Sequence, residues 1–455
     1  MHDAQAAILR RAKMNPPGPR GIERIQLIKR LTEPKIVDAV AGLWKTYGDT
    51  AAVSFPFGRT LYFLNDPTDV MDVLVKRSKK FIKGKDLETF KPLIGHGVAT
   101  SEQGEWVQHR RLVQPYFHHG ILESYVPSVI QVIEKHRNRW LEAGDGFQDF
   151  NVLFPQLSQD IVARTILGAD FGTQLEQMHR AWDGAMDFVL ARTFNPIPLP
   201  IGWPLPSYRR FNRSARFIRD TVDAVIARQM DENTSSDPNT FLARLLKSNA
   251  AGGLTSVQIR EQVLNILFAG LETTANELSS ALYLILSHPH VRQKLVAELH
   301  RVLGKDPPSY RTLEQQPYLR QVVYESLRLY PSVCVIPREA QEEVELSTVV
   351  LPRGAAVMLS PYVIHRHPKL WSDPERFEPE RFDNPSLTKP PYFLAFGAGG
   401  RTCVGDQFAI NEIMLVLSDI FKNLHPEMDT SRPIGFYFNG TLRPEPMRIR
   451  VSALH

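Results

Sequence analysis

The stretch FGAGGRTCVG, residues 396–405, combines a single thiol with four glycines. Its thiol belongs to Cys403, one of only two cysteines in the chain. Each glycine costs roughly 0.5–1 kcal/mol of ordering entropy relative to alanine, so four cost on the order of 2–4 kcal/mol. That is a sizeable share of a typical net stability. We therefore expect another group to approach this backbone so closely that larger side chains are excluded.

The position of Cys403 favours a thiolate. An apolar helical pattern over about 404–421 follows it directly, and the N–H groups of a helix N-terminus attract negative charge and lower a thiol pKa. A protease or zinc site is disfavoured, because none of the 14 histidines forms a local Cys/His signature and no CxxC or HxxH cluster accompanies the thiol. A lone thiolate in a glycine-rich loop fits haem iron, which takes four further ligands from the porphyrin.

Five residues of the loop form the pattern F-x-x-G-x-R-x-C-x-G: Phe396, Gly399, Arg401, Cys403 and Gly405. This pattern resembles the haem-binding signature of cytochrome P450 enzymes. A chance match to five specified positions in the chain has a probability of about 10⁻⁴ or less. The alternative is a buried, inert cysteine beside a turn. The resemblance implies that Cys403 is the axial ligand of haem iron and that the other four residues form its binding loop.

A second segment, YESLR, carries Glu325 and Arg328 three residues apart on a predicted helix. Alone, they would be an ordinary surface ion pair worth a few tenths of a kcal/mol. The resemblance instead implies a buried network with Arg381 of FEPERF, which would lock the proline-rich segment before the cysteine loop. Arg376 of DPERF competes for this role, because the sequence PERF occurs twice.

The longest helical pattern runs from Thr255 to about Ser287. Thr255 and Gln258 predict a capping box at its start. At 1.5 Å per residue, one continuous helix would be roughly 50 Å long. Residues 263–271 are apolar on every side of the helix, which predicts burial in the middle of the protein.

The segment AGLETT lies midway along this helix. Ala269, Gly270 and Thr273 share one face, and small residues below a hydroxyl leave a dent. A helical threonine commonly donates to the carbonyl four residues earlier, and that is the alternative role here. The resemblance to the family's A-G-x-[DE]-T-T element implies that the dent takes dioxygen and that Thr273 relays protons. Glu272 would deliver those protons from solvent.

Four further residues resemble the family's contacts to the haem propionates. Trp106 and Arg110 match W-x-x-x-R, although a helical cation–π pair would explain the same spacing. Arg338 and Arg401 resemble additional propionate partners. Three guanidinium groups would offset the charge of two buried carboxylates.

The remaining chain predicts a mainly α fold with a small β-rich lobe. Strands are predicted in a hairpin over 49–66 that turns at Pro56–Gly58, and in a group over 343–360. Helical patterns cover about 67–77, 105–117, 122–142, 156–168, 174–192, 207–230, 239–249, a segment from Pro289, and 318–329. Since no linker, repeat or low-complexity tract divides the sequence, we expect one haem-thiolate monooxygenase domain over 1–455, without a fused reductase.

Composition restricts the functional classes. A net charge of +5 over 455 residues is too weak to indicate nucleic-acid binding. Two cysteines do not make a disulfide framework, which favours a reducing compartment. No signal peptide and no run of about 18 apolar residues is found, so we expect a cytoplasmic protein without a membrane anchor. We also expect it to be a monomer.

The resemblance implies a monooxygenase that inserts one atom of O2 into a hydrophobic small molecule, such as a terpenoid, polyketide or fatty acid. It implies haem b as cofactor and electrons ultimately from NAD(P)H through a ferredoxin or flavodoxin. Two basic segments, 75–85 and His109–Arg111, are candidate docking sites, whereas 208–219 fits a solvent-facing helix. The alternatives are a haem-thiolate isomerase or dehydratase that needs no external electrons, and a non-catalytic haem sensor.

The resemblance also implies an apolar substrate pocket. Its lining would come from parts of 81–98, 185–205, Leu267–Thr273, Val333–Ile336 and 435–441. The second cysteine, Cys334, would be a small apolar wall residue.

Overall fold

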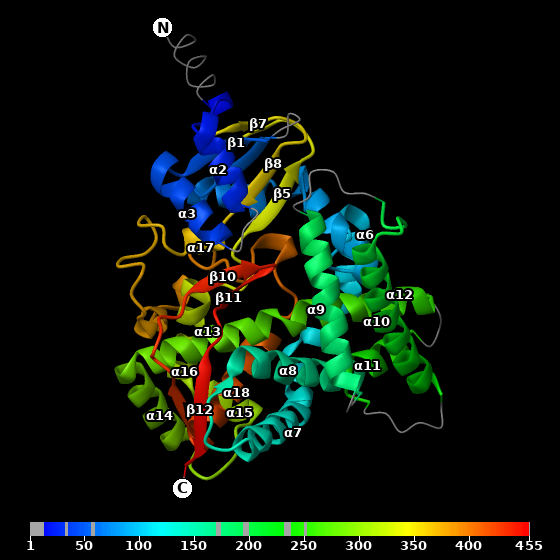
Figure 1. The fold of residues 1–455 in the computed structure, drawn as a ribbon, viewed down its shortest axis with the longest axis vertical. Helices are drawn as coiled ribbons and strands as arrows, with labels where there is room; N and C mark the ends of the chain where they lie inside the picture. Colours follow the sequence, from blue (N-terminus) through cyan, green and yellow to red (C-terminus); the bar gives the residue numbers. More distant parts are fainter. Residues whose placement is uncertain are drawn as a thin grey trace. The chain divides into compact units, whose positions relative to one another are not determined.

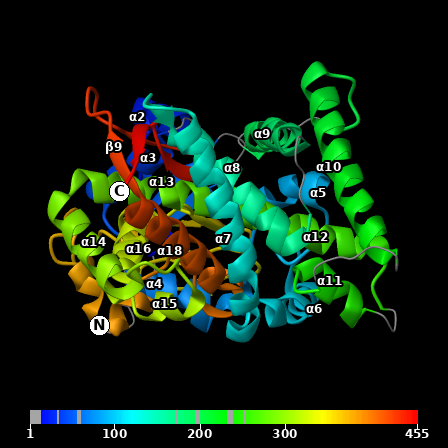
Figure 2. The ribbon, with the colours of Figure 1, turned by 90° about the horizontal axis from the view of Figure 1, so that it is seen from below.

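The computed structural model describes residues 13–31, 35–55, 60–169, 174–193, 200–231, 238–249 and 253–454. The chain divides into two compact units. Unit 1 comprises 1–87, 324–403 and 436–443, and unit 2 comprises 88–323, 404–435 and 444–455. Helices dominate and the sheets are small, which confirms the predicted fold class (Figures 1 and 2). Because both units draw on distant parts of the sequence, neither corresponds to one continuous piece of chain.

The principal sheet of unit 1 has the strand order β1-β2-β8-β5-β3. β1 and β2 pair antiparallel, as the predicted hairpin requires, while β2 and β8 are parallel. The predicted turn at Pro56–Gly58 lies outside the described residues. The strands of this sheet are β1 (Thr50–Ser54), β2 (Thr60–Leu64), β3 (Phe81–Ile82), β5 (Ile336–Ala340) and β8 (Ala356–Leu359). Two further pairs are β6 (Val344–Glu345) with β7 (Val350–Leu351), and β10 (Phe436–Asn439) with β11 (Thr441–Pro444).

Both faces of this sheet carry apolar side chains. Successive residues of a strand point to opposite faces. Accordingly, Phe63 joins one buried cluster, whereas Tyr62 and Leu64 join the other. The helices of unit 1 are α2 (Gly21–Leu31), α3 (Ile36–Tyr47), α4 (Pro67–Met71) and α17 (Pro361–Ile364), and its short helical turns are η2 (Asp72–Lys76), η3 (Ser78–Lys80), η7 (Pro379–Asp383), η8 (Pro385–Thr388) and η9 (Gly399–Arg401). Neither α2 nor α3 was anticipated from the sequence.

Unit 2 is built almost entirely from helices. They are α5 (Lys91–Ile94), α6 (Gln103–Val113), α7 (His119–Glu142), α8 (Phe150–Val162), α9 (Gln174–Thr193), α10 (Pro206–Met230), α11 (Phe241–Ser248), α12 (Ser256–Leu271), α13 (Thr273–Ser287), α14 (Pro289–Leu303), α15 (Tyr310–Glu314) and α18 (Asp406–Asn423), with the turns η5 (Gln114–Phe117) and η6 (Ala163–Leu167). A small sheet orders β4 (Gln148–Asp149), β12 (Arg448–Ala453) and β9 (Leu424–Met428). Three of the described elements cross the division between the units: η4 (Lys85–Phe90), α16 (Pro317–Leu329) and β11, whose last residue belongs to unit 2.

The long central helix is not continuous, which corrects the prediction of a single helix to Ser287. α12 ends at Leu271, α13 begins at Thr273, and Glu272 separates them. The predicted capping box at Thr255 is present. Gly270 is a weak helix former, and the hydroxyl of Thr273 donates to the carbonyl of Ala269 at 2.7 Å. Both features favour a break at this point.

Burial along α12 also differs from the prediction. Residues 263–267 are buried, but Phe268 and Gly270 are only partly buried and Ala269 is exposed. One side of the helix therefore becomes accessible just before the break. α13 is enclosed by α8, α14 and α18, all within unit 2 (Figure 2).

Candidate active site

The cysteine loop of unit 1 is closed by backbone hydrogen bonds. The N–H of Cys403 donates to the carbonyl of Phe396 at 2.8 Å, and the N–H of Gly397 donates to that of Leu394 at 2.9 Å. The single turn η9 lies between these bonds. Cys403 itself is exposed. The thiol is thus held at the end of a rigid loop and remains accessible.

Gly399 shows why the loop needs a glycine despite its cost in ordering entropy. Its φ angle is +71°, and a Cβ atom there would lie 2.4 Å from the carbonyl oxygen of Leu74. The expected close approach is therefore made by the protein backbone at this position. Gly397 also has a positive φ, of +72°. Both glycines are needed to form the loop itself.

The Glu325–Arg328 pair is buried, so it is not a surface ion pair. Nε of Arg328 donates to Glu325 at 2.6 Å and Nη2 donates at 2.8 Å, and both side chains are 0% exposed. The remaining donors of Arg328 reach the carbonyl oxygens of His365 (2.8 Å), Pro374 (2.7 Å) and Arg376 (3.1 Å). A buried ion pair is stable only when its other polar atoms are also satisfied, and this pair meets that condition.

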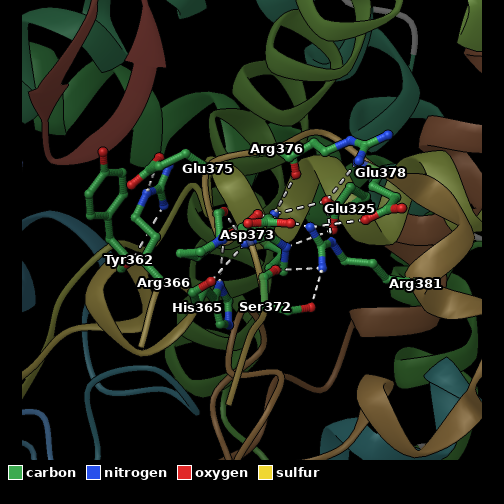
Figure 3. Close-up of polar contacts among 12 residues, drawn as sticks. Glu325, Tyr362, His365, Arg366, Ser372, Asp373, Glu375, Arg376, Glu378 and Arg381 are labelled. Carbon is green, nitrogen blue, oxygen red and sulfur yellow. Dashed lines mark hydrogen bonds and ion pairs between the residues drawn. The ribbon is translucent and has the colours of Figure 1, made fainter. Parts of the chain in front are cut away.

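Arg381, rather than Arg376, contacts the pair. Its Nε lies 3.4 Å from Oε1 of Glu325, and its Nη atoms donate to the carbonyls of Ser372 and Asp373 at 2.7 and 2.9 Å (Figure 3). Arg376 contributes only its backbone carbonyl, and its side chain is exposed.

The N–H of Glu378 also donates to Glu325 at 2.9 Å. The network therefore binds the proline-rich segment 372–381 at several backbone positions. Sequence reasoning missed the carbonyl acceptors, because main-chain groups carry no signal in the residue types.

Arg338 and Arg401 also lie in unit 1. Arg338 is half-buried on β5 and donates to the carbonyl of Pro337 at 2.8 Å. Arg401 closes η9 and is half-buried. Each guanidinium therefore sits at a partly accessible position, as a partner for an anionic group requires.

Three other predicted residues belong to unit 2. Trp106 and Arg110 lie one turn apart on α6, and both are half-buried. Nε of Arg110 donates to Gln114 at 3.1 Å. Gly405 is the N-cap of α18, and a Cβ there would meet the ring of Phe117 at an ordinary contact distance of 3.6 Å.

The break between α12 and α13 holds the remaining predicted residues. Thr273 and Glu272 are half-buried, and Ala269 is exposed. A Cβ on Gly270 would lie 3.1 Å from the side chain of Val162, so this glycine allows close packing in unit 2. Val162 thus occupies part of the predicted dent beside Gly270. The accessible surface of the helix at this point belongs to Ala269 and Thr273.

One predicted docking segment is partly neutralised. Within 75–85, Lys76 and Arg77 pair with Asp72 at 3.1 and 3.3 Å, and Lys80 pairs with Glu342 at 2.6 Å. These pairs reduce the basic character on which docking to an acidic partner would depend.

The donor set at Cys403 fits haem. Among the described residues, no group of three or more His, Cys, Asp or Glu side chains could hold a metal ion. A metal at this exposed thiol would therefore need most of its ligands from a prosthetic group, and a porphyrin supplies four nitrogens. The rigid loop and the arginines on partly accessible positions agree with such a group.

Comparison with known proteins decides the family. The model of the cytochrome P450 family matches residues 16–450. The chain belongs to the cytochrome P450 family. Its relatives include cytochrome P450 3A31 of Mesocricetus auratus, 29% identical over 445 residues that cover 90% of this chain and 87% of the relative. Cyclooctat-9-en-7-ol 5-monooxygenase of Streptomyces melanosporofaciens is 30% identical over 381 residues, 82% of each chain.

Family membership makes the chain a haem-thiolate monooxygenase of the P450 kind, which uses O2, a substrate and a redox partner. Across the described ranges, no helix is both long and apolar enough to span a membrane.

Proposed function

We propose that this P450 inserts one oxygen atom of O2 into a hydrophobic small molecule of terpenoid, polyketide or fatty-acid type. Electrons would come from NAD(P)H through a separate ferredoxin or flavodoxin. The observation that carries the proposal is the exposed Cys403 in a loop that backbone hydrogen bonds close on both sides of η9. An accessible thiol on a rigid, glycine-dependent turn is suited to bind iron at a fixed position.

In this proposal, Cys403 holds the iron of haem b. Bound haem with a thiolate ligand supplies the oxygen-activating chemistry, because the thiolate favours O–O cleavage. Arg338, Arg401 and Arg110 would bind the haem carboxylates, since guanidinium groups form paired hydrogen bonds with them. The family's W-x-x-x-R pattern gives Trp106 of α6 the same role.

Thr273 and Glu272 would move protons. The hydroxyl of Thr273 donates to the carbonyl of Ala269 on the accessible side of the helix, and a hydroxyl oxygen can accept a hydrogen bond as well as donate one. Glu272 stands at the break next to it, where a carboxyl can exchange protons with solvent.

Aromatic side chains beside the break support an apolar substrate. The ring of Phe268 lies 5.2 Å from that of Phe90 and 6.3 Å from that of Trp182, measured between centroids. All three belong to or pack against the large apolar cluster of unit 2. The name of the Streptomyces relative specifies oxidation at position 5 of cyclooctat-9-en-7-ol, which agrees with this substrate class.

A binding and turnover experiment tests the proposal. Purified haem-loaded protein is titrated with a library of hydrophobic compounds, and the haem spectrum is followed. NADPH, ferredoxin reductase and ferredoxin are then added, and oxygenated product is quantified. Product that depends on these electrons supports the monooxygenase. Spectral shifts without product would favour a sensor, and electron-independent rearrangement of a peroxide would favour an isomerase or dehydratase.

A substitution tests the ligand. Cys403→Ser should abolish the thiolate-type spectrum of the carbon monoxide complex. Persistence of that spectrum would show that another side chain binds the iron.

A further inference from the structure

His365 occupies a junction in unit 1 and is 0% exposed. It follows α17 directly. Its Nδ1 atom lies 2.9 Å from the carbonyl oxygen of Arg328, and its Nε2 atom lies 2.8 Å from the backbone nitrogen of Leu394. An amide N–H can only donate, so Nε2 accepts from Leu394 and Nδ1 donates to Arg328. One imidazole ring therefore joins the end of α16 to the segment before the cysteine loop.

The surroundings hold this ring in one state. Burial and the positive charges of Arg328 and Arg366 lower the pKa of His365 to about 3. A second ring proton would sit on Nε2 and face the N–H of Leu394, which would break the hydrogen bond between them. The ring stacks on Phe393, with centroids 5.4 Å apart and planes inclined by 13°. His365 thus keeps a single neutral tautomer and a single orientation.

The bond to Leu394 continues into the cysteine loop. The carbonyl of Leu394 accepts from Gly397, and the carbonyl of Phe396 accepts from Cys403, at 2.9 and 2.8 Å. On the other side, Nη1 of Arg328 donates to the carbonyl of His365 at 2.8 Å. His365 is therefore bonded through both its ring and its backbone to Arg328, which forms the ion pair with Glu325.

We propose that His365 is a positioning residue for Cys403, which transmits the rigidity of the Glu325–Arg328–Arg381 network to the cysteine loop. The proposal rests on the proposed function, in which Cys403 binds haem iron. Without the bond from Leu394, the loop would keep its internal hydrogen bonds but lose its fixed distance from α16. The sulfur would then be less firmly held against the iron.

Two variants separate the two ring nitrogens. His365→Asn keeps an N–H donor near the position of Nδ1, but its shorter side chain cannot accept from Leu394. His365→Gln places an oxygen acceptor near the position of Nε2 and loses the donor to Arg328. If the hydrogen bond from Leu394 positions the cysteine loop, His365→Asn should loosen the loop more than His365→Gln does.

Three quantities are measured on the haem-loaded protein: amide hydrogen exchange over 394–403, the thiolate-type fraction of the carbon monoxide complex, and the haem reduction potential. One lost buried hydrogen bond should accelerate exchange about tenfold in His365→Asn. The thiolate fraction should fall and the potential should shift in the same variant. His365→Gln should stay within about twofold of the parent in exchange. If His365→Asn does not fold, His365→Phe replaces it, because a phenyl ring keeps the volume and the stacking on Phe393.

His367→Asn is the matched control. His367 is equally buried at 2% exposure, lies on the same segment, and donates to Asp49 at 2.9 Å. The His367→Asn variant should leave amide exchange over 394–403, the thiolate fraction and the haem reduction potential unchanged. If His365→Asn or its Phe substitute matches His367→Asn in all three, the proposal is wrong. That outcome is distinct from failure of the proposed function, in which Cys403→Ser would retain the thiolate-type spectrum.

Discussion

Two buried glutamates, one in each unit, show how differently the two interiors handle a carboxyl group. Glu325 of unit 1 contacts two guanidinium groups and the N–H of Glu378. Glu412 of unit 2, on α18, accepts from the hydroxyl of Ser158 at 2.8 Å, and its Oε2 atom accepts no hydrogen bond from the described residues. Burial raises the pKa of Glu412 to about 8.

The difference between Glu325 and Glu412 shows where this protein stabilises its structure with buried charges. A buried carboxylate is stable only with a full set of donors, which unit 1 supplies beside the cysteine loop. Glu412 has only the neutral hydroxyl of Ser158 as a donor, so its carboxyl group stays protonated near neutral pH. Glu325 beside the cysteine loop is thus held by fixed charges, whereas Glu412 on α18 is held as a neutral carboxyl group.

The largest effect is expected from Glu325→Ala. It leaves Arg328 buried without its carboxylate, which should lower the free energy of unfolding by about 3–5 kcal/mol and reduce haem retention. Urea unfolding and haem content measure both effects. Arg376→Ala is the control, because its exposed side chain is not used, and it should change stability by no more than about 0.5 kcal/mol. Equal losses in the two variants would contradict the assignment of the network.

Glu412→Gln should alter the pH dependence of stability. The folded pKa of about 8 lies above the ordinary carboxyl pKa of 4.5, so the carboxyl of the parent protein contributes stability that is complete below pH 4.5 and is lost as pH rises to 8. The glutamine keeps an acceptor for Ser158 and has no proton to lose. Its stability relative to the parent should therefore rise by about 1.4 kcal/mol per pH unit across this window.

Urea midpoints between pH 5 and pH 9 measure this change. Glu142→Gln, at the exposed end of α7, should leave the pH profile unchanged. Parallel profiles for the parent and the Glu412 variant would show that Glu412 is ionised when folded, like an ordinary carboxylate.

Thr273→Ala tests the accessible side of the helix break. The variant should retain haem and lose little stability, because the hydroxyl donates to a carbonyl at the exposed Ala269, where water can replace it. It should divert electrons from product to hydrogen peroxide, lowering product formed per NADPH severalfold. Thr273→Ser restores the hydroxyl and should restore coupling. Unchanged coupling in the alanine variant would remove Thr273 from proton transfer.

The smallest effect concerns the capping box of α12. Thr255→Ala removes the acceptor for the N–H of Gln258 and should cost about 1 kcal/mol of stability, measured by thermal unfolding. Thr255→Ser keeps the acceptor and should recover most of it. A loss as large as that of Glu325→Ala would show that the cap supports more than one helix end.

Much of the secondary structure could be predicted, because it depends on local patterns. The helices over 122–142, 174–192, 207–230 and 318–329 match α7, α9, α10 and α16 closely. The helix α2 and the strand β5 were missed, since their sequences have mixed polarity and their buried sides are covered by distant segments. The helix α3 was missed although Ile36, Val40 and Leu43 follow the helical spacing of apolar residues. The break at Glu272 was also missed, because a strongly apolar pattern masked the weak helix formers beside it.

The sequence by itself determined the family, the cysteine loop and the candidate residues, because motif spacing and helix capping involve neighbours a few positions apart. Only the tertiary structure decided between Arg381 and Arg376, filled the space at Gly399 with the carbonyl of Leu74, and joined His365 to Leu394. These outcomes depend on burial and on contacts between residues far apart in the chain. Two identical PERF segments have the same local chemistry, and only the fold brings one of their arginines to Glu325.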